Sequence, residues 1–214
     1  MFRMARESSM TRSPAKSGFA TLELASWCLI ILPILLMGAD TLGMAHDQNV
    51  THTVAAETTR EVAGHALSWH SDGNMGIYQV DYDTLRATID SMADRALVEL
   101  STSSLFLMDA SVVACYWVVS VHPTSGLIES DEAMSCAERG PRAQELSLVE
   151  HRAHVPAESV GNPNPVSVGD ERFAPKAILI GVQVGGRFRG VSPLTGNDLM
   201  KHGVIRSLRE EMAL

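Results

Sequence analysis

The side chains that could carry chemistry in this sequence are first of all its histidines. His151 and His154 are three residues apart, and His65 and His70 flank a short apolar stretch. Neither pair belongs to an H-E-x-x-H motif or lies near a pair of cysteines, which are the arrangements that bind zinc. Pro156 also limits any helix that would place the first pair on one face. We therefore expect ordinary surface histidines and no metal site.

An enzyme would need a recognisable nucleophile or a phosphate-binding loop. No serine lies in a G-x-S-x-G motif, and the glycines of GVQVGGRFRG (181–190) fall in a strand-like pattern with no helix close behind. Asp81 and Asp83 could coordinate a cation, although capping of a helix by Asp83 is the simpler role. We therefore expect no catalytic residue, no cofactor and no enzymatic activity.

A lone carboxylate, Glu23, lies near the start of an apolar stretch. The uncharged run Leu24–Ala39 has 16 residues, whereas a membrane-spanning helix needs roughly 20. A membrane span would therefore begin near Phe19 and include Glu23, and Pro33 would kink it. A carboxylate at the centre of a bilayer costs roughly 2.5–3.5 kcal/mol. Glu23 at this position requires a specific reason.

The charge distribution indicates how such a span would be oriented. Residues 1–18 hold four basic residues and one acidic residue, so a chain of net charge −8 carries −11 on residues 19–214. Positive flanks of membrane spans stay in the cytoplasm. We expect a single-pass inner-membrane protein with a cytoplasmic N-terminus and a C-terminal domain in the periplasm or outside the cell. Its acidic body argues against nucleic-acid binding.

The three cysteines differ in their context. Cys28 lies inside the apolar run and is expected to face lipid or another helix. Cys115 and Cys136 both lie in the part expected to be exported, where an oxidising compartment permits a disulfide. Such a bond would stabilise the domain by roughly 3 kcal/mol on the chain-entropy model. Two free buried thiols are the alternative, and the exported location favours the disulfide.

The elements that must position these residues indicate an α+β fold. One helix is expected from about Phe19 to Trp69, where Gly73-Asn74 follows, with its first half in the membrane and its second half amphipathic. The corresponding segments are a leader (1–18), a membrane half (19–42), an amphipathic extension (43–72) and an exported domain (73–214). The expected buried positions of the helix outside the membrane are Leu42, Ala45, Val50, Val54, Ala55, Val62, Ala66 and Trp69.

The exported domain is expected to contain a second helix and a small antiparallel sheet. Asp83 would cap a helix over residues 84–100, and the strands would cover residues 112–121 and 177–191, with a bulge or sharp bend at the glycines of the latter. Residues 135–140 are expected to form a polar connection, and residues 197–214 are expected to form a short terminal helix. The expected buried face of the second helix comprises Leu85, Ile89, Met92, Ala96 and residues 98–100.

The residues around Glu23 resemble a type IV prepilin processing site. In that family a basic leader ends in glycine, the next residue is often phenylalanine, and a glutamate is the fifth residue of the mature chain. Gly18, Phe19 and Glu23 in G-F-A-T-L-E-L have this arrangement. The resemblance implies cleavage between Gly18 and Phe19 by a prepilin peptidase on the cytoplasmic side. It also gives Glu23 a role, because its carboxylate can pair with the new amino terminus of a neighbouring subunit.

The following segment, ILPILLMGADTLGMAHDQNVTHTVAAETTREVAG (31–64), is similar to TadE-type pseudopilins of tight-adherence pili, and VSPLTG (191–196) is similar to their C-terminal strand. This resemblance implies a pilin-like fold and a minor pseudopilin that primes, caps or otherwise assists assembly of a tight-adherence (type IVc) pilus. Its implied partners are the peptidase, other pilins or pseudopilins, and the inner-membrane assembly platform. Three alternatives remain: an uncleaved signal-anchored periplasmic binding or adaptor module, a membrane-tethered hydrolase with its site in residues 70–214, and a minor pseudopilin of type II secretion.

Overall fold

A computed structural model describes residues 14–65, 68–72, 75–79, 82–121, 128–153, 176–192 and 198–207. Most of the expected leader, Ala66 and the C-terminal seven residues lie outside these ranges. The elements in chain order are α1 (Pro14–His65), β1 (Ser68–Asp72), β2 (Met75–Gln79), α2 (Tyr82–Ser103), β3 (Leu107–Val121), β4 (Ile128–Arg139), the 3₁₀ turn η1 (Ala143–Glu145), α3 (Leu148–Ala153), β5 (Lys176–Phe188) and β6 (Leu199–Ser207).

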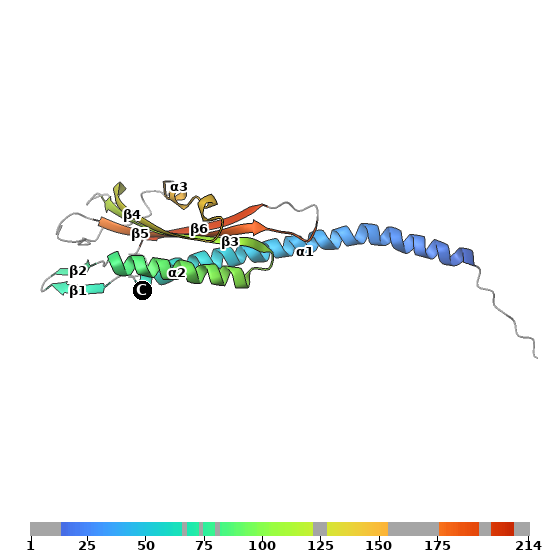
Figure 1. Ribbon diagram of the computed structural model, residues 1–214, viewed down its shortest axis with the longest axis horizontal. Helices are drawn as coiled ribbons and strands as arrows, with labels where there is room; N and C mark the ends of the chain where they lie inside the picture. The colour runs from blue at the N-terminus through green and yellow to red at the C-terminus, as the bar shows by residue number, and fades with distance from the viewer. Residues whose placement is uncertain are drawn as a thin grey trace, which may run out of the picture.

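The first helix, α1, is the longest element of the molecule. Its 52 residues correspond to about 78 Å at 1.5 Å per residue. It begins at Pro14, five residues before the expected start, because proline is well tolerated in the first turn of a helix. It ends at His65 rather than Trp69, because residues 68–72 form β1, which pairs with β2 in an antiparallel hairpin. Figure 1 shows the N-terminal part of α1 projecting away from the rest of the fold.

The main sheet has four antiparallel strands in the order β4-β3-β5-β6. The two expected strands are confirmed as β3 and β5, and the expected α+β class with an antiparallel sheet is correct. The prediction of a helix over residues 197–214 was wrong for residues 199–207, which form β6. This strand pairs with β5, with Leu199 opposite Arg187 and Ser207 opposite Leu179. Backbone pairing with an existing sheet thus outweighs the local pattern.

The expected polar connection at 135–140 was also wrong, because it belongs to β4. This strand forms one edge of the sheet, and several of its side chains face solvent. Edge strands commonly carry polar and charged residues that discourage pairing with other chains. A polar sequence at this place is therefore compatible with a strand. The irregularity expected in β5 lies instead on its partner, between Met108 and Ser111 of β3.

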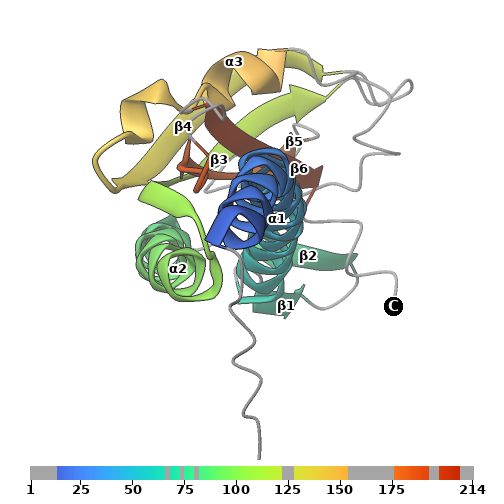
Figure 2. The ribbon, with the colours of Figure 1, turned by 90° about the vertical axis from the view of Figure 1, so that its right-hand side faces the viewer.

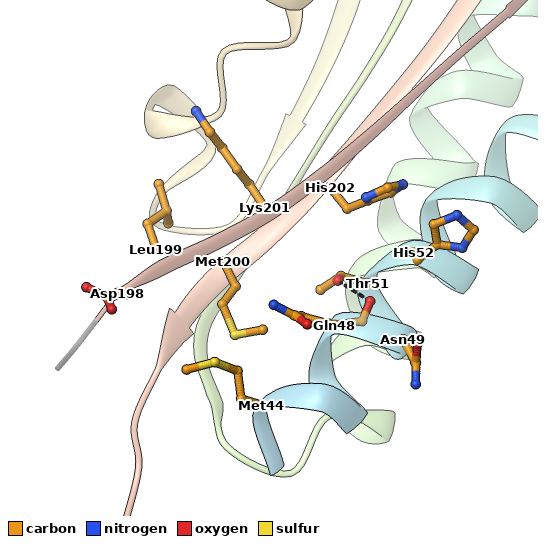
Figure 3. A pocket seen from close by; sticks show the side chains of 10 residues that line it. All are labelled: Met44, Gln48, Asn49, Thr51, His52, Asp198, Leu199, Met200, Lys201 and His202. Atoms are coloured by element: carbon orange, nitrogen blue, oxygen red, sulfur yellow. Dashed lines mark hydrogen bonds between the residues drawn. The ribbon is translucent and has the colours of Figure 1, made fainter. Parts of the chain in front are cut away.

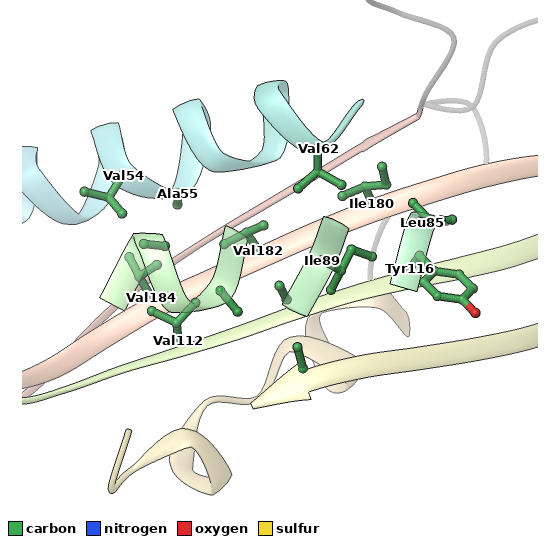
Figure 4. Packing of buried hydrophobic residues seen from close by; sticks show 14 of the residues in the cluster. Val54, Ala55, Val62, Leu85, Ile89, Val112, Tyr116, Ile180, Val182 and Val184 are labelled. Atoms are coloured by element: carbon green, nitrogen blue, oxygen red, sulfur yellow. The ribbon is translucent and has the colours of Figure 1, made fainter. Parts of the chain in front are cut away.

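The main core lies between the sheet and the two long helices. α1 contributes Val54, Ala55 and Val62, which pack against β5 and α2 (Figure 4). Viewed along the helix axes, α1 and α2 lie side by side on one face of the sheet (Figure 2). A second, smaller cluster on the other face includes Trp117 and Leu148, under η1 and α3.

Helix α2 differs in detail from its expected form. It begins at Tyr82, so Asp83 lies in its first turn. Val98, expected to be buried, is 63% exposed. The buried face instead follows the spacing of three to four residues expected for a single helix face, and consists of Leu85, Ile89, Ala93, Ala96 and Leu100.

Candidate functional site

The projecting part of α1 is an apolar surface that nothing in the described chain covers. Every side chain from Thr21 to Ala39 is exposed except that of Leu36, which is half-buried. Leu22 and Leu29 are 73% and 77% exposed. In the described part of the chain, α1 is the one helix long and apolar enough to cross a membrane. Large uncovered apolar surfaces mark contacts with lipid or protein. The expectation of one membrane-length helix near the N-terminus is therefore confirmed.

The residues expected to take part in processing and assembly all lie on this helix. Gly18 and Phe19 are in its second turn, and Pro33 lies within it without ending it. The Glu23 carboxylate is exposed and makes no hydrogen bond or ion pair with the residues that the structure describes. Only its backbone carbonyl accepts a bond, from Ser26 Oγ at 2.7 Å. A carboxylate in this position is available to a partner outside the chain. Processing at Gly18-Phe19 and a kink at Pro33 stay predictions.

Two buried aspartates hold α1 to the domain where its apolar part ends. Asp40 is 1% exposed. Its Oδ1 accepts a hydrogen bond from the backbone N–H of Val191 at 2.6 Å, and its Oδ2 accepts one from Ser192 at 2.8 Å. These residues belong to the connection between β5 and β6. A buried carboxylate is tolerated only when its oxygens are paired in this way.

Asp47 makes the same kind of contact one segment away. It is fully buried, and its two oxygens accept hydrogen bonds from the N–H groups of Leu105 (2.8 Å) and Phe106 (3.0 Å), in the connection between α2 and β3. The two connections are themselves joined, because the Arg189 N–H donates to the Phe106 carbonyl at 3.0 Å. One face of α1 therefore holds both connections through hydrogen bonds.

A glycine between the aspartates lets the domain approach the helix closely. A Cβ on Gly43 would lie 2.3 Å from the ring of Phe106, a distance that no real contact allows. The Phe106 ring also packs edge-on against Phe188, with centroids 5.8 Å apart. We call Asp40, Gly43 and Asp47, with residues 105–106 and 191–192, the junction. The junction fixes the domain to the point where the apolar part of α1 emerges.

This role of the helix was not predicted from the sequence. Leu42 and Ala45, which follow the expected apolar spacing, are both exposed, and Leu42 is 75% exposed. The buried positions are instead Asp40, Gly43 and Asp47: the two aspartates accept hydrogen bonds from the backbone of two loops, and Gly43 faces the ring of Phe106. The available signal was their spacing: residues seven apart on a helix lie on one face.

The expected disulfide is confirmed. Cys115 on β3 and Cys136 on β4 are directly opposite in the antiparallel register, with their Cα atoms 4.1 Å apart and their sulfur atoms bonded. Cys115 is fully buried beneath η1 and α3. The bond therefore holds an edge strand to the centre of the sheet. Cys28 is free and exposed on the apolar part of α1.

A groove of about 570 Å³ lies between α1 and β6. Figure 3 shows Met44 and Met200 meeting across it, and the rings of His52 and His202 near each other. The ring centroids of the two histidines are 4.5 Å apart. Within the described part of the chain, no three histidine, cysteine or acidic side chains form a group suited to a metal ion. The side chains of the histidines considered from sequence (65, 70, 151 and 154) lie outside the described residues.

Two arginines connect elements on the solvent side of the domain. The pKa of Arg139 on β4 is raised, mainly by its hydrogen bond to Asp94 and further by Asp90, while partial burial opposes the rise. The pKa of Arg142 is raised mainly by its hydrogen bond to Asp109, with Glu145 adding to the effect. Both guanidinium groups therefore stay charged at any physiological pH. Their ion pairs connect elements of the fold, and neither guanidinium group faces the groove or the junction.

No protein-family model matches the chain, and neither the curated proteins nor the solved structures include one that is significantly similar to it. The described residues themselves define an α+β protein in which an uncovered apolar helix continues into a helix packed on a disulfide-bonded antiparallel sheet.

Proposed function

We propose that the protein is a TadE-type minor pseudopilin, a structural subunit that primes, caps or otherwise assists assembly of a tight-adherence pilus after cleavage by a prepilin peptidase. In this proposal the chain is a substrate of the peptidase and has no catalytic role. The fold is pilin-like, the apolar part of α1 lies in the inner membrane, and the domain lies in the periplasm or in a filament outside the cell.

The observation that carries the proposal is the exposed Glu23 carboxylate on an otherwise apolar, uncovered helix surface. A helix serving only as an anchor gains nothing from a carboxylate in its span, because the charge opposes insertion. A helix that must pack against a neighbouring subunit can use the charge, because pairing with a cation removes the penalty. Glu23 is five residues into a chain that would start at Phe19.

The junction also keeps the domain at a fixed distance from Glu23, which suits an assembly subunit. Glu23 and Asp40 are 17 residues apart, or about 26 Å along the helix. Because Asp40 is bonded to the β5–β6 connection, the domain keeps a fixed offset from the charge in the span. Pairing of Glu23 with the amino terminus of a neighbour would then set the position of both domains.

The test is the N-terminal sequence and intact mass of the protein purified from its native envelope. We expect the mature chain to begin at Phe19, with a mass increase corresponding to N-methylation. A chain that begins at Met1 would contradict the proposal and favour the signal-anchored adaptor. A variant with Gly18→Ala serves as the matched control, since blocked cleavage should leave the leader attached. Co-purification with type II secretion components, in place of pilus components, would assign the processed protein to the other filament class.

A further inference from the structure

We propose that the membrane-side end of the folded domain itself lies in the lipid headgroup region, through an apolar rim with two arginines. The rim consists of Leu105, Met108 and Val191 with Arg187 and Arg189. The inference rests on the proposed function for the membrane location of α1, and extends it to a lipid-binding surface on the domain.

The rim exposes apolar side chains at one place in the fold. Leu105, Met108 and Val191 are 67%, 45% and 55% exposed. Leu105 and Val191 come from the two connections that the junction holds, although these are distant in sequence. Their backbone N–H groups donate to Asp47 and Asp40, respectively, so their side chains are held on loops with a fixed backbone. Exposed apolar groups on fixed loops mark a contact surface.

The junction places this surface at the end of the apolar helix. The stretch from Phe19 to Ala39 has 21 residues, about 31 Å of helix, which matches the hydrocarbon thickness of a bilayer of about 30 Å. The next residue, Asp40, accepts a hydrogen bond from the backbone N–H of Val191. A bilayer filled by Phe19–Ala39 therefore has its surface at the level of the β5–β6 connection. Figure 1 shows the β3 start and β5 end at the side of the domain from which α1 projects.

The charges next to the apolar side chains suit a lipid surface. Arg187 and Arg189 are both exposed. Arg187 is opposite Met108 in the β3–β5 register, and Arg189 Nη1 lies 3.8 Å from Met108 Sδ. Arginines beside apolar groups are typical of membrane interfaces, where the aliphatic stem lies in the acyl region and the guanidinium contacts phosphate. The acidic Asp109 nearby is paired with Arg142.

Lipid is the occupant favoured over a second protein, because the rim is continuous with a helix surface that is uncovered on all sides. From Thr21 to Ala39 the exposure covers every face of the helix, and Leu42, two residues past Asp40, is also exposed. A single protein partner requires apolar side chains on one face only, whereas the consecutive apolar residues from Trp27 to Leu32 cover every face of the helix. A helix that is apolar all round suits a bilayer, which surrounds it and meets the end of the domain. The rim lies where such a bilayer surface would be.

The test uses spin labels on the full chain reconstituted in vesicles of phosphatidylethanolamine and phosphatidylglycerol. In a Cys28→Ser background, single labels are attached through Leu105→Cys or Val191→Cys. Controls on the domain are Val98→Cys on α2 and Val149→Cys on α3, which replace side chains that are 63% and 49% exposed. Collision with oxygen, which concentrates in lipid, is compared with collision with a water-soluble nickel chelate. A label through Ile30→Cys, 59% exposed on α1, reports on the span.

We expect the ratio of oxygen to nickel collisions to be several-fold higher at positions 105 and 191 than at 98 and 149. Equal ratios at all four positions, with position 30 in lipid, would overturn the rim proposal and leave the proposed function intact. Protection of the rim labels from both reagents would also overturn it, since that result indicates a covering protein. A label at position 30 that is accessible to the nickel chelate would contradict membrane insertion of α1, and with it the proposed function.

Discussion

Asp40 and Asp47 lie two turns apart on one face of α1, and each accepts hydrogen bonds from two consecutive backbone N–H groups of a different loop. Paired N–H groups form a small positive site that suits a carboxylate. The two loops are some 85 residues apart in the sequence. Their common attachment to one helix fixes the domain to the apolar segment of α1.

Replacement of Asp47 by asparagine is expected to destabilise the domain by about 2 kcal/mol, because the amide nitrogen would face a backbone N–H and one charged hydrogen bond would be lost. Unfolding by urea in detergent measures the change, followed by the fluorescence of the buried Trp117 in a background where Trp27 and Trp69 are replaced by phenylalanine. Glu57→Gln is the matched control, since Glu57 is exposed on the same helix. Identical unfolding curves for the two variants would show that the junction contributes no stability.

Replacement of Gly43 by alanine is expected to cost roughly 1–3 kcal/mol through overlap with the Phe106 ring. Gly38→Ala is the control on the same helix, because a Cβ there meets nothing within 4 Å. The loss measured for Gly43→Ala should shrink when Phe106→Ala is introduced first. If Gly43→Ala costs the same free energy of unfolding in the Phe106→Ala background, contact between the helix and the ring is not the cause of the loss.

Removal of the disulfide by Cys115→Ala with Cys136→Ala is expected to lower the free energy of unfolding by roughly 3 kcal/mol. Cys28→Ser should leave it unchanged, because Cys28 is exposed outside the domain core. Alkylation of the denatured protein provides an independent check: one cysteine should react without reductant and all three with it. Reaction of three cysteines without reductant would contradict the bond.

Replacement of Glu23 by glutamine is expected to reduce the fraction of the protein found in sheared filaments several-fold, because a neutral amide cannot neutralise the amino terminus of a neighbour. Leader cleavage should continue, since Gly18 and Phe19 are retained. Glu57→Gln again serves as the control, and quantitative immunoblots of filament and envelope fractions give the ratio. Normal incorporation of the glutamine variant into filaments would show that this charge has no role in assembly.

The sequence alone determined the elements whose signals are local. These signals are the apolar run of α1, the amphipathic pattern of α2 and the β-branched residues of β3 and β5. Apolar side chains recur along a helix or strand at the spacing that places them on its buried face, so a short stretch of sequence is enough to indicate the element. The pairing of Cys115 and Cys136 was also accessible, since the chain holds only these two cysteines outside the apolar run of α1. Glu23 stood out because a charge within an apolar span is costly.

Only the tertiary structure decided what Asp40, Gly43 and Asp47 do, and that residues 199–207 form a strand. The partners of Asp40 are 151 and 152 residues away in sequence, and β6 exists through its pairing with β5. Hydrogen bonds of this kind depend on backbone groups that every residue carries, so the identity of the distant residues gives no signal of them. Their energy is gained only when the chain has folded and brought the helix, the two loops and the sheet together.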